Sequence, residues 1–174
     1  KLMINTEKLT GILVDYKRNF IPNQWQEEKY KWEAIKHFQG NWDINASDFL
    51  GMFSKSLDKT GNLLLSRNNF PAGMIKEFAK KDTEAVRSMF IDLYDENKNL
   101  IDRVERFIST ADELREKYDD GTWKQHFQNA NSITTYLWLR YPDKYYIYKY
   151  SEFIEVSRVL GSDFTPKRGA TAHN

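Results

Sequence analysis

Aromatic and basic side chains are concentrated in one stretch of the chain, residues 133–150. Seven of its 18 residues are aromatic, and they are interleaved with the cations Arg140, Lys144 and Lys149. This composition has two interpretations. In the first, the rings belong to the core and the tyrosine hydroxyls reach the surface. In the second, some rings form a platform on which bases stack while the cations contact phosphates, as flipped or single-stranded nucleotides require.

The second interpretation predicts a nucleic-acid site that begins slightly upstream of this stretch. Four cations are expected to contact phosphates: Lys124, Arg140, Lys144 and Lys149. Bases are expected to stack on Trp123, Trp138, Tyr146 or Tyr148. His126 and either Asn129 or Asn131 are expected to read a base edge, since Asn pairs bidentately with adenine. The candidate DNA-binding residues are therefore Trp123, Lys124, His126, Asn129, Asn131, Trp138, Arg140, Lys144, Tyr146, Tyr148 and Lys149.

The sequence lacks the motifs that catalysis or metal binding requires. Neither G-x-x-x-x-G-K-[ST] nor G-x-G-x-x-G occurs, so no glycine-rich loop is available to hold a nucleotide. The chain has no Cys, and the spacing of His37, His126 and His173 matches no metal-site pattern. Adjacent carboxylates such as Asp112 and Glu113 fall on predicted helices, where they point apart. The sequence therefore predicts a non-catalytic domain without metal or cofactor.

Length and charge narrow the functional classes further. The chain has 174 residues, enough for one domain, and its aromatic content of 15% argues against disorder. Its formal net charge is +1, whereas dedicated nucleic-acid binders are usually strongly basic. Residues 82–120 contain 12 acids and 6 bases, and residues 122–150 contain 4 bases and 1 acid. The near-neutral balance favours protein docking as the alternative to DNA recognition.

Apolar residues recur at three- and four-residue spacing along most of the chain, which predicts helices. These helices are expected to position the candidate residues. Leu9, Ile12, Leu13 and Tyr16 predict a first helix over residues 6–19. Seven further helices are expected, after residues 22, 47, 70, 83, 98, 132 and 151, with Ser47, Thr83, Ser132 and Ser151 as N-terminal caps. Residues 123–127 are expected to form one or two helical turns, and residues 145–149 a strand. The predicted fold is mainly α: a compact single-domain bundle of about eight helices with at most a short strand pair.

The two ends of the chain and its apolar content indicate the domain organisation and the cellular location that we expect. Residues 1–164 are predicted to form the helical module, and residues 165–174, which are poor in apolar side chains, are typical of a linker leading to another domain. No apolar run approaches the roughly 18 residues of a transmembrane helix, and the N-terminus has no signal-peptide pattern. We therefore expect no membrane partner and a cytoplasmic location.

Several segments spread along the chain form a longer pattern. They are residues 123–131 (WKQHFQNAN), 135–150 (TYLWLRYPDKYYIYKY), 30–39 (YKWEAIKHFQ), 69–71 (NFP), 85–90 (AVRSMF) and 92–94 (DLY). These segments resemble the N-terminal region of McrB-like AAA+ proteins, the motor subunits of modification-dependent restriction systems. The resemblance covers about residues 12–165, nearly the whole chain.

The resemblance implies that this domain precedes an AAA+ motor, which would bind nucleotide and Mg²⁺ outside this chain. It also implies a nuclease subunit as a partner and a role in bacterial defence. In such systems the N-terminal domain is generally the specificity module, which binds DNA or modified bases. The expectation is a non-catalytic module that recognises DNA through an aromatic-basic segment, residues 123–150. The alternative is a protein-docking or assembly module without DNA contact.

Overall fold

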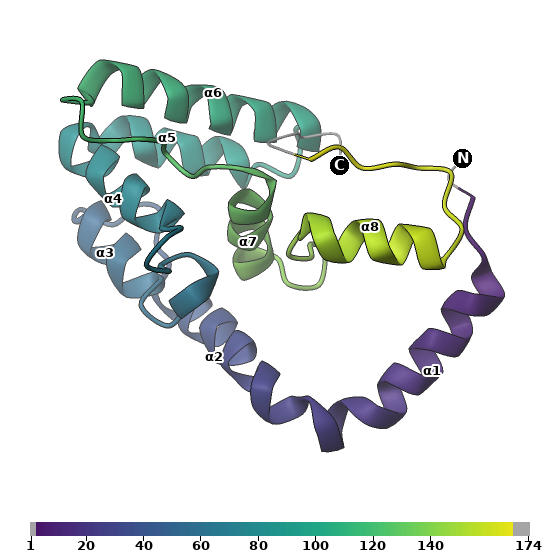
Figure 1. Ribbon diagram of the computed structural model, residues 1–174. Coiled ribbons are helices and arrows are strands. Elements are labelled where there is room, and N and C mark those ends of the chain that lie inside the picture. The colour runs from purple at the N-terminus through teal and green to yellow at the C-terminus, as the bar shows by residue number, and fades with distance from the viewer. Residues whose placement is uncertain (1–2, 169–174) are drawn as a thin grey trace.

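The computed structural model describes residues 3–168, and the last part of the predicted linker, residues 169–174, lies outside this range. The predicted mainly α fold is confirmed, since the described residues form eight α-helices and a short 3₁₀ turn with no strand (Figure 1). The helices are α1 (Thr6–Asn23), α2 (Trp25–Asn41), α3 (Phe49–Ser56), α4 (Pro71–Lys81), α5 (Thr83–Leu93), α6 (Leu100–Tyr118), α7 (Ala130–Arg140) and α8 (Tyr150–Val159), with the turn at Gly61–Leu63.

The core lies where α2 to α7 meet. Helices α3 to α6 pack on one another in sequence, and α2 packs on both α3 and α7. Phe90 of α5 is fully buried at the centre. Its ring centroid lies 5.4 Å from that of Phe53 on α3 and 5.3 Å from those of Phe107 on α6 and Tyr136 on α7. One ring cluster therefore joins four helices.

Helix starts differ by a few residues from the predicted ones. The capping side chains are Asp48, Asp82 and Asn129, where the sequence favours Ser47, Thr83 and Ser132. In each case an Asp or Asn oxygen accepts a backbone N–H three residues further on, a role in which these residues equal or exceed Ser and Thr. Helix α8 begins at Tyr150 without a side-chain cap, not after Ser151.

The predicted strand at residues 145–149 is wrong. The segment is irregular, and side chains of α7 satisfy its backbone in place of a neighbouring strand. The Tyr148 N–H donates to Thr134 Oγ1 at 2.9 Å, and Asn131 Nδ2 donates to the Tyr148 carbonyl at 2.7 Å. With both groups paired in this way, the segment needs no sheet partner.

The predicted helical turns at residues 123–127 are also wrong. This segment is irregular and leads from the end of α6 to the start of α7 (Figure 1). Asp119 Oδ1 accepts the Trp123 N–H at 3.0 Å, and the Arg115 guanidinium donates to the Trp123 carbonyl at 2.9 Å. Phe127 has a φ of 60°, a left-handed conformation that interrupts any helix.

Helix α1 is longer than predicted, and it stands to one side of the core (Figure 1). It continues through Pro22 to Asn23, and the chain turns at Gln24 instead. None of its residues is buried. Its C-terminal end leads into α2, and its N-terminal end is held by the Asn5 N–H, which donates to the Leu160 carbonyl at 2.8 Å.

A buried cation, Arg103 of α6, fixes the segment that follows α7. Its guanidinium donates to the Leu93 carbonyl at 2.7 Å, to Glu96 at 2.8 Å and to the Tyr145 hydroxyl at 2.9 Å. The Tyr145 hydroxyl in turn donates to Glu96 at 2.7 Å, and Lys144 pairs with the same carboxylate. We call Glu96, Arg103, Lys144 and Tyr145 the Arg103 cluster.

We expect the Arg103 cluster to make the free energy of unfolding depend on pH in the acidic range. Burial acts to raise the pKa of Glu96, but hydrogen bonds from Lys144, Tyr145 and Arg103 outweigh it and hold the pKa below its ordinary 4.5. A carboxyl with a depressed pKa stabilises the fold fully above its unfolded-state pKa, and this contribution is lost as pH falls through the folded-state pKa. Unfolding free energy should therefore decline below about pH 4.5, and less steeply in Glu96→Gln than in the wild type.

Urea denaturation at a series of pH values checks this prediction. Asp82 and Asp92, whose pKa values are also lowered, remain in both proteins, so the difference in slope reports Glu96 alone. Equal slopes in the two proteins would contradict the prediction.

Candidate functional site

A groove lies where the C-terminal ends of α2, α5 and α7 meet. Two adjoining hollows share Arg140 and Tyr141, and together we call them the Arg140 groove. The first extends toward α2 and α5, and the second toward the turn after α7. The groove is lined by Gln39, Trp42, Asp43, Ile44, Phe90, Ile91, Tyr94, Arg140, Tyr141, Pro142, Asp143 and Lys144.

Aromatic packing and hydrogen bonds hold the groove walls in place. The Trp42 ring stacks on Phe38 at 4.9 Å and meets Tyr94 edge-on at 5.5 Å. The Tyr141 hydroxyl donates to the Tyr94 carbonyl at 2.9 Å, and the Tyr94 hydroxyl donates to the Tyr136 carbonyl at 3.2 Å. These bonds join α5 to α7, so the walls are preformed.

The loop after α2 supplies another wall of the groove. Arg87 of α5 donates to the Ile44 and Ala46 carbonyls, the latter at 3.1 Å. Its guanidinium carbon also lies 5.0 Å from the centroid of the Phe49 ring. Ile44 is thereby held in the same hollow as Ile91, which is 52% exposed.

The rim of the Arg140 groove carries charges of both signs. Arg140 is exposed, lies 4.9 Å above the Tyr141 ring, and forms no ion pair among the described residues. Lys144 pairs with Glu96, a carboxylate that it shares with Arg103, and Asp43 and Asp143 also line the groove. In addition, three helices end here, and each C-terminus carries partial negative charge. The electrostatic environment is therefore balanced, not basic.

Most of the predicted stacking rings take part in the fold. Trp138 is only 9% exposed. The half-buried Trp123 meets Phe78 edge-on at 5.5 Å, and Tyr148 meets Phe153 at the same distance. Tyr146 differs from these, because its side chain is 81% exposed. Of the four candidate rings, Tyr146 alone is exposed to this degree.

The predicted base-reading residues are held by internal hydrogen bonds. Asn129 caps α7, and its side chain and that of Ser132 bond reciprocally to each other's backbone N–H groups. Asn131 donates to the Tyr148 carbonyl at 2.7 Å. His126 Nε2 lies 2.9 Å from Asp112 Oδ1, while its Nδ1 accepts the Gln128 N–H at 2.8 Å. This arrangement places the ring proton on Nε2.

The four predicted phosphate contacts are dispersed. Arg140 and Lys144 both line the Arg140 groove. Lys149 pairs with Glu152 at 2.8 Å and lines a different hollow together with Tyr146 and Tyr148. Lys124 is exposed on the segment before α7 and forms no ion pair within residues 3–168. The structure thus brings together only part of the predicted set.

The apolar residues of the groove, Trp42, Ile44, Ile91 and Tyr94, are absent from the candidates chosen by sequence. Trp42 and Ile44 lie in the loop after α2, and Ile91 lies off the buried stripe of α5. The signal available in the sequence is an isoleucine that falls outside the apolar stripe of its own helix.

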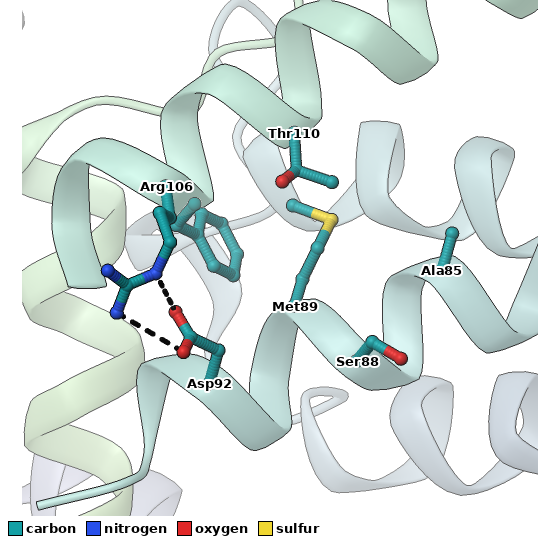
Figure 2. Close-up of a pocket in the computed structure, with 7 residues that line it drawn as sticks. Ala85, Ser88, Met89, Asp92, Arg106 and Thr110 are labelled. Carbon is teal, nitrogen blue, oxygen red and sulfur yellow. Dashed lines mark hydrogen bonds and ion pairs between the residues drawn. The ribbon is translucent and has the colours of Figure 1, made fainter. Parts of the chain in front are cut away.

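A separate hollow lies between α5 and α6, and none of its lining residues belongs to residues 123–150. It is lined by Ala85, Ser88, Met89, Asp92, Arg106, Phe107 and Thr110. Figure 2 shows the Arg106 guanidinium bound to the Asp92 carboxylate at one end, with bonds of 2.8 and 3.2 Å. Because its charged groups satisfy each other, this hollow presents no free charge to a ligand.

Within residues 3–168, no group of three or more His, Cys, Asp or Glu side chains is placed to bind a metal ion. No helix in the same range has both the length and the apolar content needed to cross a bilayer. Comparisons with protein-family models, curated proteins and solved structures found no match to this chain.

Proposed function

We propose that this domain is a non-catalytic protein-docking module of a McrB-like restriction ATPase, and that the Arg140 groove receives an apolar side chain of a partner protein from the same system. The observation that carries the proposal is the make-up of the groove. It combines a preformed aromatic wall, the exposed Ile91 and a rim of mixed charge. Aromatic residues and Arg are enriched in protein interfaces, which surround an apolar centre with a polar rim.

The same features argue against phosphate as the main ligand. Binding to DNA depends on several cations that together replace counterions on neighbouring phosphates. Around the groove, Asp43, Asp143 and three helix C-termini offset Arg140, and Lys144 is already paired with Glu96. A partner segment with an apolar side chain between charges of both signs suits this environment better than a polyanion does.

Substitution of Ile91 tests the groove. Peptides selected from a phage-displayed random library on the wild-type chain should carry an apolar residue flanked by charges. Ile91→Asp should weaken their binding about tenfold or more, because it places a carboxylate in the apolar part of the groove. The matched control is Val156→Asp on α8, since Val156 is also 52% exposed. Peptides that bind equally well to both variants and the wild type would contradict the proposal.

DNA recognition is the second candidate, and one observation favours it. Lys124 and Arg140 are exposed and have no carboxylate partner in the described part of the chain. If DNA is the ligand, fluorescence anisotropy will show binding that weakens steeply with salt and is reduced in a Lys124→Ala, Arg140→Ala double variant. Absence of binding to single-stranded and duplex DNA, methylated or not, would leave docking as the function.

A further inference from the structure

Helix α1 has an apolar stripe that its own fold covers in part only at the two ends. The stripe consists of Leu9, Ile12, Leu13, Tyr16 and Phe20, at the spacing of one helix face. An amphipathic helix normally buries such a face, yet no residue of α1 is buried. Ile12, Leu13 and Tyr16 are 45%, 48% and 50% exposed.

The uncovered part is the middle of the stripe, from Ile12 to Tyr16, since Leu9 is partly buried. Phe20 contacts Tyr16 at a centroid distance of 5.0 Å and Trp25 of α2 at 6.2 Å, so its end of the stripe has neighbours within the chain. Helix α1 lies between its two points of attachment and to one side of the core (Figure 1). A partner for this face must come from outside the described residues.

We propose that this partner is the same stripe of a second copy of the chain, packed antiparallel. A two-fold axis between Ile12 and Leu13 sets Leu9 against Tyr16 of the second copy and Ile12 against Leu13 of the second copy. The stripe is then self-complementary, as a symmetric dimer requires.

Charge complementarity favours this register. Lys8 and Asp15 lie on the same flank of the stripe, and neither forms an ion pair among the described residues of its own chain. In antiparallel pairing, equal flanks face each other, so each Lys8 lies near Asp15 of the second copy. On the other flank, Lys17 lies near Thr10 of the second copy, and no like charges are brought together.

The size of the contact sets the expected strength of the dimer. An 18-residue helix is about 27 Å long, and one helix per copy buries less than the roughly 800 Å² per partner of a standard interface. We therefore expect a reversible dimer whose population rises with protein concentration. This dimer requires no partner protein and leaves the Arg140 groove free, so it can fail or hold independently of the proposed function.

Sedimentation equilibrium over a protein concentration series tests the dimer. The wild type should shift from monomer to dimer mass, and Leu13→Glu should raise the dissociation constant about tenfold or more. Val14→Glu is the matched control, because Val14 is 50% exposed but lies on the opposite face of α1. It should dimerise like the wild type, and circular dichroism will show that both variants keep their helices.

A charge reversal tests the register. Asp15→Lys should weaken the dimer by placing two lysines side by side, and the double variant Lys8→Glu, Asp15→Lys should restore it. A wild type that remains monomeric at every concentration would overturn the proposal. Equal weakening by Val14→Glu and Leu13→Glu, or no restoration in the double variant, would also overturn it.

Discussion

Replacing Phe90 with Ala is expected to lower the free energy of unfolding by about 3–5 kcal/mol, the range for deletion of a buried aromatic ring. The Phe90 side chain is fully buried, and its ring contacts Phe53, Phe107 and Tyr136 on three other helices. No single neighbour can move to fill the space without losing contacts of its own. The substitution therefore leaves a cavity at the point where the core is joined.

Urea denaturation followed by circular dichroism measures this effect. The control is Ile91→Ala at the next position, because Ile91 is 52% exposed. That change should alter stability by no more than about 0.5 kcal/mol, as is usual at exposed positions. A loss below about 1 kcal/mol for Phe90→Ala would show that the core can close around the missing ring, contrary to this account.

The second large effect is expected from Arg103→Met, which should cost about 3 kcal/mol. Removing one partner of a buried ion pair typically costs about 3–5 kcal/mol, because the other charge is left without compensation. The lower end applies here, since Glu96 keeps Lys144 and the Tyr145 hydroxyl as partners. The change also leaves the buried Leu93 carbonyl without the bond that Arg103 supplies.

Arg106→Met is the matched control for this prediction. Arg106 lies one turn further along α6 and also binds a carboxylate, that of Asp92, but its side chain is 48% exposed. An exposed pair of this kind is worth about 1 kcal/mol or less. Similar losses for the two variants in urea denaturation would contradict the structural role assigned to Arg103.

The helices of the core could be predicted from sequence because their apolar residues repeat with helical period. Val104, Phe107, Ala111 and Leu114 fall on one stripe, and all four are buried in α6. The same period in α1 predicts the helix but not its exposure, since periodicity shows which face is apolar and not what covers it. The covering surface depends on tertiary contacts that the local pattern does not contain.

The irregular segment 145–149 was not predictable, and the reason differs from that for α1. Tyr145-Tyr146-Ile147-Tyr148-Lys149 has the composition of a strand, but strand formation needs a neighbouring strand. The side chains of Thr134 and Asn131 occupy its backbone groups instead. Only the fold brings these residues together, because they are separated from Tyr148 by 14 and 17 positions.

The candidate site was predictable in part. Arg140 and Lys144 could be singled out because cations between aromatic residues are conspicuous in a sequence. The ion pair of Lys144 could not be predicted, since its partner Glu96 lies 48 residues earlier in the chain. Asn129 is equally typical of base recognition and of helix capping, and the structure uses it as a cap.

The most direct test of the docking function is an NMR titration that follows the tryptophan indole N–H signals. The chain has 5 Trp residues, and Trp42 lies in the Arg140 groove while Trp123 lies on the segment that carries Lys124. A library-selected peptide should shift the Trp42 signal, and duplex or single-stranded DNA should shift neither signal at moderate salt. Salt-sensitive shifts of Trp42 or Trp123 with DNA, together with no response of Trp42 to the peptide, would contradict the account.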